Sequence, residues 1–307
     1  MKKVGITLGD PAGVGPEIFI KSLTYLEEYD VSFKVYGSKA VLDFYSRLLG
    51  ISLESFPGNV FFEDVCSVSD FIPGKVSVEA GKAQFEYLKS AVSAVKSGGI
   101  DAIVTLPINK ESIKSAGFNF PGHTEYFASE FKIKDFAMML ANSKLKVVLE
   151  TTHIPLNKVA NRISSDSIFK KLLLIDRYFP GEKIAVAGLN PHAGESGLFG
   201  DEEERVIKPA IKKARDLGLK VYGPFPSDTV FNRAVSGEFG TVLCMYHDQG
   251  LIPVKLTGFE ETVNVTLGLP FVRTSVGHGT AYDIAGKGIA SVKSFISAVD
   301  LAVKMLG

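Results

Sequence analysis

The sequence has few cysteines, no excess of charge and no long apolar run. Its two cysteines, Cys66 and Cys244, form no Cys-x-x-Cys pair, so neither a disulfide framework nor a zinc finger is indicated. The 34 basic and 34 acidic residues balance, which removes the attraction that general nucleic-acid or anionic-membrane binding needs. No apolar stretch approaches the roughly 18 residues of a membrane span. The residues before Asp10 lack the long apolar region of a secretory signal, so we expect a soluble cytoplasmic protein.

The chain also lacks the common nucleotide-binding and hydrolase motifs: GxxxxGK[ST], GxGxxG, HExxH and GxSxG are all absent. What it has is alternation of short β-branched apolar runs with segments of helical period, which predicts an α/β fold with a mainly parallel sheet. Strands are expected at Lys3–Leu8, Phe33–Tyr36, Asp101–Leu106, Phe136–Leu140, Leu145–Glu150, Lys183–Gly188, Thr241–Tyr246 and Val263–Leu267. Helices are expected at Pro16–Glu28, Lys39–Leu49, Glu79–Ser97, Leu156–Ile163, Asp166–Tyr178, Asp201–Leu217 and Val292–Leu306.

Histidines are the most informative polar residues, and none of the five is expected inside a helix. His153, His192 and His247 each follow directly after a predicted strand. In open α/β sheets ligands bind at the carboxyl ends of strands, and three imidazoles suit Zn²⁺ while leaving a position for water or substrate. One such histidine alone is more often an ordinary loop or core residue. The shared placement of three favours a metal site, although their spacing matches no local metal signature.

Two glycine-rich segments are further candidates for ligand contact. Gly9–Glu17 links the first strand to the first helix and is either an anion-binding turn or an ordinary tight turn. Ser275–Ala290 is either a loop that wraps a flat ligand, with Asp283 accepting hydrogen bonds from ribose hydroxyls, or a plain connection. A phosphate or carboxylate site needs Lys, Arg and amide groups, and one stretch after His247 contains Lys255, Asn264 and Arg273. Solvated surface residues are the alternative there.

Six segments, in this order and over nearly the whole chain, closely resemble the 4-hydroxythreonine-4-phosphate dehydrogenases of vitamin B6 synthesis. They are Gly9–Glu17, Gly122–Glu125, Thr151–Leu156, Asn190–Glu195, Tyr246–Gly250 and Asn264–Gly288. The segment His278–Ala290 also resembles the cofactor loop of isopropylmalate and isocitrate dehydrogenases, whose fold that family shares. Two positions depart from those patterns: Gly277 replaces a common Asp, and Ser291-Val292 replaces Asn-Pro.

The resemblance implies a two-domain isopropylmalate dehydrogenase-like fold with an interdomain cleft. Residues 1–120 with 260–307 would form a cofactor-side domain, and residues 121–259 a domain for metal, substrate and dimerisation. It also implies a homodimer whose metal site uses histidines from both subunits. The ligands implied for the metal, which is zinc or alternatively magnesium or cobalt, are His153, His192 and His247. The substrate contacts implied are His123, Thr124, Lys255, Asn264 and Arg273.

For the cofactor, the resemblance implies NAD, with NADP as the alternative, bound by His278, Gly279, Thr280 and Asp283. Candidates for proton transfer or for support of a histidine are Lys255, Asp248 and Asp228. The implied reaction is oxidation and decarboxylation of 4-phosphohydroxy-L-threonine to 3-amino-2-oxopropyl phosphate in pyridoxal 5'-phosphate biosynthesis. A metal acting as a Lewis acid would assist loss of hydride to the nicotinamide.

Three alternatives remain open from the sequence. Relatives within the family oxidise 4-phospho-D-threonate or D-erythronate 4-phosphate instead. A three-histidine zinc site also suits hydrolysis by a metal-bound hydroxide. The third alternative is a metal-dependent binding protein without catalysis, and the cofactor-like loop at His278–Gly288 argues against it.

Overall fold

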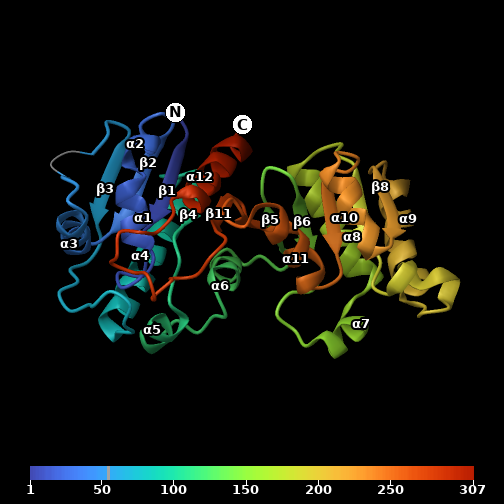
Figure 1. Ribbon diagram of the computed structural model, residues 1–307. Coiled ribbons are helices and arrows are strands. Elements are labelled where there is room, and N and C mark those ends of the chain that lie inside the picture. Colours follow the sequence, from blue (N-terminus) through green and yellow to red (C-terminus); the bar gives the residue numbers. More distant parts are fainter. Residues whose placement is uncertain (54–55) are drawn as a thin grey trace. The chain divides into compact units, whose positions relative to one another are not determined.

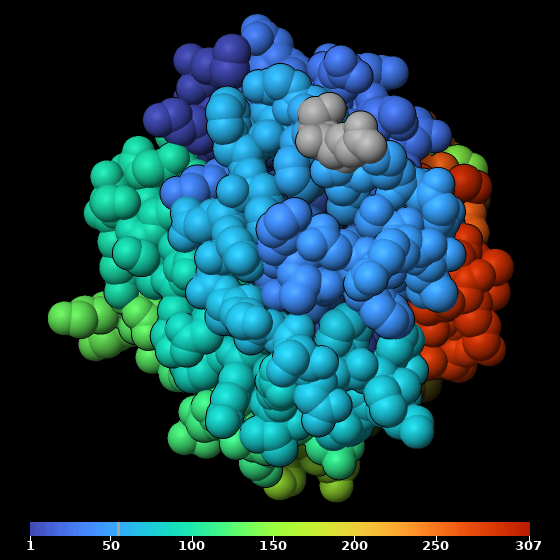
Figure 2. All heavy atoms as spheres, turned by 90° about the vertical axis from the view of Figure 1, so that its left-hand side faces the viewer, coloured from blue at the N-terminus to red at the C-terminus, as the bar shows by residue number. Residues whose placement is uncertain are grey.

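The computed structural model describes residues 1–53 and 56–307, which fold into two compact units (Figure 1). The first unit consists of Met1–Ile133 together with Leu269–Gly307, and the second consists of Lys134–Gly268. Figure 2 looks onto the first unit and shows C-terminal residues, in red, at the edge of a face built from N-terminal ones. Lys21 Nζ fixes the two segments together by donating to the carbonyl oxygens of Gly288 (3.0 Å) and Ala290 (2.7 Å).

The first unit contains a parallel sheet in the order β3-β2-β1-β4-β11. Its strands are β1 (Lys3–Thr7), β2 (Ser32–Gly37), β3 (Val60–Asp64), β4 (Ala102–Thr105) and β11 (Val272–Val276). Its helices are α1 (Gly15–Lys21), α2 (Leu23–Leu26), α3 (Lys39–Leu49), α4 (Val78–Lys96), α5 (Lys110–Ser115), α6 (His123–Glu130) and α12 (Lys293–Met305). Every residue of β4 and β11 is buried, as expected for inner strands of a parallel sheet covered on both faces.

The second unit contains a mixed sheet in the order β10-β5-β6-β9-β7-β8, in which β5 runs antiparallel to both of its neighbours and the other pairings are parallel. Its strands are β5 (Ala137–Ala141), β6 (Lys146–Leu149), β7 (Ile184–Ala187), β8 (Val221–Phe225), β9 (Thr241–Cys244) and β10 (Val263–Leu267). Its helices and turns are η1 (Leu156–Lys158), α7 (Val159–Arg162), α8 (Ser165–Tyr178), η2 (Pro191–Gly197), η3 (Glu203–Ile207), α9 (Lys208–Asp216), α10 (Ser227–Val235) and α11 (His247–Gly258). A core of buried side chains from β6, β7, β9 and α11 holds the carboxyl ends of these strands in place.

The limits of the two units differ from the expected domain limits at residues 120 and 260. Helix α6, with His123 and Thr124, belongs to the first unit because its Phe127 ring packs edge-on against Phe271 at 5.8 Å between centroids. Asn264 belongs to the second unit because β10 pairs with β5, where Asn264 lies opposite Leu140.

The eight expected strands are present, and the expected helices are found with some of them divided into shorter pieces. Strands β3, β8 and β11 were not expected, nor were helices α5, α6, α10 and α11. Breakers explain two of these omissions: β8 contains Gly223 and Pro224, and α11 contains Gly250 and Pro253. The expectation that no histidine lies in a helix was wrong, because α6 begins at His123 and α11 at His247.

Within the described ranges, no helix combines the length and the apolar character needed to cross a membrane.

Candidate functional site

Two of the predicted metal ligands lie side by side at the carboxyl ends of neighbouring strands. Strands β6 and β9 pair in parallel, His153 follows the first, and His247 follows the second. Beyond the last paired residues, Thr151 Oγ1 donates to the Met245 carbonyl oxygen at 2.7 Å, which keeps the two segments together. As a result, the imidazole rings of His153 and His247 are 5.5 Å apart between centroids.

The imidazole ring of His247 is oriented by the carboxylate of the next residue, Asp248. Its Nδ1 lies 2.7 Å from Oδ1 of Asp248, and this interaction directs Nε2 away from the carboxylate. Imidazoles that bind a metal usually donate their other ring N–H to a carboxylate or a carbonyl in this manner. Two imidazoles bound to one zinc ion place their ring centroids about 5 Å apart, given Zn–N bonds of about 2 Å. The separation and the chemistry of His153 and His247 therefore fit two ligands of one metal ion.

Within one chain, His192 does not join this pair. It lies in the turn η2 after β7, and its ring packs against that of Phe199 at 5.9 Å between centroids. Among residues 1–53 and 56–307, no group of three or more His, Cys, Asp or Glu side chains is placed to hold a metal ion. A single chain thus assembles two of the three predicted imidazoles.

The turn that carries His192 has an unusual backbone held by a buried carboxylate. Residues from His192 to Ser196 have φ between 41° and 80°, a conformation that costs roughly 1–2 kcal/mol per non-glycine residue. Glu203, 1% exposed, accepts hydrogen bonds from the backbone N–H groups of Leu189 (2.7 Å) and Asn190 (2.8 Å). Sequence analysis did not single out Glu203, because it lies within the expected helix Asp201–Leu217 and its partners are backbone N–H groups of another segment.

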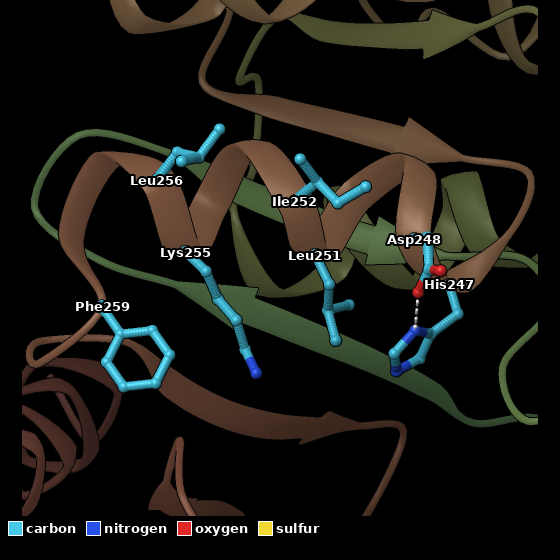
Figure 3. A pocket seen from close by; sticks show the side chains of 7 residues that line it. All are labelled: His247, Asp248, Leu251, Ile252, Lys255, Leu256 and Phe259. Atoms are coloured by element: carbon cyan, nitrogen blue, oxygen red, sulfur yellow. Dashed lines mark hydrogen bonds and ion pairs between the residues drawn. The ribbon is translucent and has the colours of Figure 1, made fainter.

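Helix α11 presents a row of side chains around an open pocket of about 420 Å³ (Figure 3). The pocket is lined by His247, Asp248, Leu251, Ile252, Lys255, Leu256 and Phe259. In Figure 3 the side chains of His247, Leu251 and Lys255 extend to the same side of the helix. Lys255 Nζ lies 5.5 Å from the centroid of the Phe259 ring. One helix therefore supplies a metal-ligand candidate, its carboxylate partner and a cation.

Two other predicted residues of the second unit lie outside this row. Asn264 is on β10, and its Oδ1 is buried with no hydrogen-bond partner among the residues that the structure describes. Asp228 is exposed in the first turn of α10, which begins at Ser227 after β8.

In the first unit, His123, Thr124 and Arg273 lie in one buried region. Arg273 on β11 is 2% exposed, and its Nη2 donates to Thr105 Oγ1 of the neighbouring β4 at 2.7 Å. Burial, and then the positive charge of Arg273, hold the pKa of His123 well below its usual 6.5, so this imidazole is neutral at physiological pH. Burial also lowers the pKa of the Arg273 guanidinium, and the negative charge of Glu125 partly offsets this by raising it. A buried cation beside a neutral imidazole is suited to binding an anion.

The two glycine-rich segments contact each other within the first unit. The hydroxyl of Tyr282 donates to Oδ2 of the fully buried Asp10 at 2.5 Å, and Asp10 Oδ1 accepts from the backbone N–H of Ala12 at 2.9 Å. The N–H of Val14 donates to the carbonyl oxygen of Thr280 at 3.0 Å. Burial raises the pKa of Asp10, whereas its two hydrogen bonds lower that pKa. The loop before α1 thus supports the middle of the proposed cofactor segment.

The carboxylate of Glu17 supports the end of that segment. Glu17 is fully buried on α1 and accepts from the backbone N–H groups of Ala290 (2.8 Å) and Gly288 (3.2 Å). Between these anchored ends, Asp283 is exposed and lies in a series of turns rather than before a helix. His278 Nδ1 lies 2.8 Å from the carbonyl oxygen of Gly279. Because Asp283 is exposed, a ligand has access to it from solvent.

Known proteins similar to this chain match almost its full length. The family profile described as pyridoxal phosphate biosynthetic protein PdxA matches residues 31–302. A 4-hydroxythreonine-4-phosphate dehydrogenase of Sulfurihydrogenibium sp. (strain YO3AOP1) is 43% identical, with 99% of this chain and 98% of the relative aligned. A D-threonate 4-phosphate dehydrogenase of Pectobacterium atrosepticum is 40% identical, with 99% of each chain aligned.

Solved structures agree with these relatives. The crystal structure of 4-hydroxythreonine-4-phosphate dehydrogenase from Klebsiella pneumoniae superimposes with a TM-score of 0.87 at 40% identity, covering 99% of this chain and 98% of that one. A β-decarboxylating dehydrogenase from Thermococcus kodakarensis, 16% identical with a TM-score of 0.54 over all of this chain and 84% of its own, shares the fold. The expected fold class and the resemblance seen in the sequence motifs are confirmed: the chain belongs to the PdxA family of pyridoxal phosphate biosynthetic proteins, that of the 4-hydroxythreonine-4-phosphate dehydrogenases.

Proposed function

We propose that the protein oxidises the C3 hydroxyl group of 4-phosphohydroxy-L-threonine with NAD, in the synthesis of pyridoxal 5'-phosphate. The alcohol loses a proton and a hydride, and the hydride reduces NAD⁺ to NADH. The β-keto acid so formed loses its carboxylate as CO₂ and takes up a proton, which leaves 3-amino-2-oxopropyl phosphate. The observation that carries the proposal is the pair of imidazoles, His153 and His247, at adjacent strand ends of a chain with full-length dehydrogenase relatives.

A divalent metal ion is proposed to bind to His153 and His247 of one subunit and to His192 of a second. Zinc is the metal that three imidazoles favour, with magnesium and cobalt as alternatives. When bound, the metal supplies Lewis-acid polarisation of the substrate oxygen atoms. The contribution of the chain is to orient His247 through Asp248, which lies 2.7 Å from its Nδ1.

Exposed apolar side chains support the proposed homodimer. They lie on the same three segments as the candidate ligands, and a second copy of the chain is the partner that supplies the third imidazole to the pair. The side chains and their exposed fractions are Leu156 (68%), Leu198 (71%), Phe199 (46%), Ile252 (59%), Leu256 (82%) and Phe259 (65%). Exposed apolar side chains next to candidate ligands are expected where a second subunit completes the site.

Substrate contacts are proposed in both units. In the first unit, His123, Thr124 and the buried Arg273 provide a cation and hydrogen-bonding groups for a phosphate or carboxylate. In the second unit, Lys255 and Asn264 are the corresponding candidates, and the buried Oδ1 of Asn264 is available to a substrate N–H or O–H group. For proton transfer we favour Lys255, because Asp248, in the same pocket, is engaged with His247, and Asp228 does not line this pocket.

NAD is proposed to bind at His278, Gly279, Thr280 and Asp283, with the exposed Asp283 carboxylate accepting hydrogen bonds from the adenosine ribose. Because a carboxylate repels a 2′-phosphate, NAD is proposed over NADP.

A second candidate substrate is D-threonate 4-phosphate. It is favoured by a specific observation, since relatives named for that activity are 40% and 42% identical to this chain over almost its whole length. Both candidates are 4-phosphorylated 3-hydroxy acids, so the same groups would bind them.

The experiment is a measurement of NADH formation with 4-phosphohydroxy-L-threonine, 4-phospho-D-threonate and D-erythronate 4-phosphate, each with and without a chelator. We expect the highest kcat/KM with the first compound, loss of turnover on chelation and recovery on addition of zinc. A higher kcat/KM with 4-phospho-D-threonate would establish the second candidate. Turnover of a phosphorylated compound without NAD or NADP would contradict both and favour metal-dependent hydrolysis.

A further inference from the structure

The side chain of Gln249 joins three segments that follow strands of the second unit. Its Oε1 accepts from the backbone N–H of Met245 at 2.5 Å, just after β9. Its Nε2 donates to the carbonyl oxygen of Gly188 at 2.6 Å, just after β7, and to Ser227 Oγ at 2.8 Å, after β8. Gln249 is 6% exposed, and both ends of its amide are hydrogen-bonded. One amide therefore fixes the carboxyl ends of β7, β8 and β9 to one another.

Each of these segments leads to a residue of the proposed site. Gln249 is in the first turn of α11, two residues after His247, and its bond to Met245 reaches back across the start of that helix. Gly188 is packed against the turn of His192: a Cβ on Gly188 would lie 2.9 Å from the Cα atom of Ala193. Ser227 precedes Asp228 at the start of α10. The Gln249 amide thus holds the backbone just before His247, and the backbone at Gly188, which packs against Ala193, the residue after His192.

We propose that Gln249 is a positioning residue for the metal sites of the dimer: it fixes the backbone of His247, a ligand of one site, and that of His192, a ligand of the other. The inference rests on the proposed binding of metal by these histidines. Gln249 itself presents no atom to the metal, because both polar atoms of its amide are engaged with protein partners. Loss of the amide would let the strand ends shift relative to each other, and metal affinity depends steeply on ligand geometry.

The test is the zinc affinity of the full chain, measured by competition with a chromophoric chelator in the absence of substrate and NAD. Gln249→Met keeps the length of the side chain and removes its hydrogen bonds, and we expect zinc to bind about 10- to 100-fold more weakly. The matched control is Gln84→Met in the first unit. Gln84 is 1% exposed, and its Oε1 accepts from the backbone N–H of Asn109 at 2.8 Å. This control also loses a buried amide, but its zinc affinity should stay within about threefold of that of the unaltered chain.

Folded Gln249→Met that binds zinc as tightly as the control would overturn the inference. If Gln249→Met does not fold, the zinc affinity of Ser227→Ala tests the inference instead. This variant removes one of the two acceptors of Gln249 Nε2 and leaves its hydrogen bond to Gly188. Weaker zinc binding by Ser227→Ala than by the Gln84 control supports the inference, and equal binding overturns it. An unaltered chain that binds no zinc would contradict the proposed metal site itself, and this inference with it.

Discussion

The rings of His153 and His247 lie 5.5 Å apart between centroids, although the two residues follow different strands, β6 and β9, and are far apart in the sequence. Their proximity follows from the parallel pairing of β6 with β9, in which Val147 lies opposite Val242 and Leu149 opposite Cys244. Each strand then continues into a segment that places an imidazole beyond the sheet edge. Because parallel strands end at the same edge, residues distant in the sequence meet there.

Removal of any of the three imidazoles should remove bound metal. We expect His153→Ala, His192→Ala and His247→Ala each to lose most bound metal and most turnover, while the circular dichroism spectrum stays that of the folded chain. His153 and His192 are exposed and His247 is 34% exposed, so truncation leaves no buried cavity. Metal content per subunit, measured by mass spectrometry, checks the prediction. Full occupancy in two of the three variants would contradict the three-histidine assignment.

Mixed dimers of these variants should reveal how the ligands are divided between subunits. If one chain supplies two ligands and its partner the third, two of the three pairwise mixtures regain one complete site per heterodimer. The adjacency of His153 and His247 within one chain makes their mixture the one expected not to recover activity, whereas each should recover with His192→Ala. The measurement is NADH formation by purified heterodimers carrying two different affinity tags.

Recovery in none of the three mixtures, with heterodimers present, would mean that one chain holds all three ligands. Recovery of the His153→Ala and His247→Ala mixture would instead assign these two histidines to different subunits within one site.

Local patterns allowed much of the fold to be predicted, because short runs enriched in β-branched apolar residues favour buried strands. Strand β10 was predicted with its observed limits, Val263–Leu267, and α3 with its limits, Lys39–Leu49. Strand β11 escaped prediction because Arg273 interrupts its apolar pattern. That guanidinium is tolerated in a buried strand because Thr105 accepts one of its hydrogen bonds at 2.7 Å.

The candidate site was predictable to the level of strand ends and no further. In the sequence, His153, His192 and His247 each follow a strand, and nothing distinguishes one from another. That β6 and β9 are neighbours, so that His153 and His247 meet, is known only from the strand order of the folded sheet. The buried carboxylates Asp10 and Glu203 were not singled out, because their partners come from tertiary packing or from backbone N–H groups of an irregular turn. Such contacts leave no periodic signal in the sequence.

The hydrogen bond from Tyr282 to Asp10 should give Tyr282→Phe a pH-dependent cost in stability. Burial raises the folded-state pKa of Asp10 above its usual 3.8, so the folded state loses stability as the pH rises through that pKa. Because the Tyr282 hydroxyl lowers this pKa, its removal enlarges the loss. Tyr282→Phe should therefore reduce the free energy of unfolding by about 1–2 kcal/mol near pH 7.5 and by less near pH 4.5.

Urea unfolding at the two pH values measures this difference. The matched control is Tyr25→Phe, since Tyr25 is 47% exposed in the same unit, and we expect a change below about 0.5 kcal/mol at either pH. An equal cost of Tyr282→Phe at both pH values would show that the hydroxyl does not stabilise an ionised Asp10.

The preference for NAD should depend on Asp283. A carboxylate beside the adenosine ribose accepts hydrogen bonds from a free 2′-hydroxyl and repels a 2′-phosphate. Asp283→Lys should lower kcat/KM with NAD and raise it with NADP, moving the ratio of the two by about tenfold or more, which corresponds to about 1.4 kcal/mol. A different role for Asp283 would be to cap a following helix, but residues 282–286 form turns and not a helix, and Asp283 is exposed. The matched control is Asp30→Lys, which makes the same change of charge at an exposed position of the same unit and should leave the ratio unchanged. An unchanged ratio in folded Asp283→Lys would mean that this carboxylate does not contact the ribose, and that the choice between the cofactors is made elsewhere in the loop.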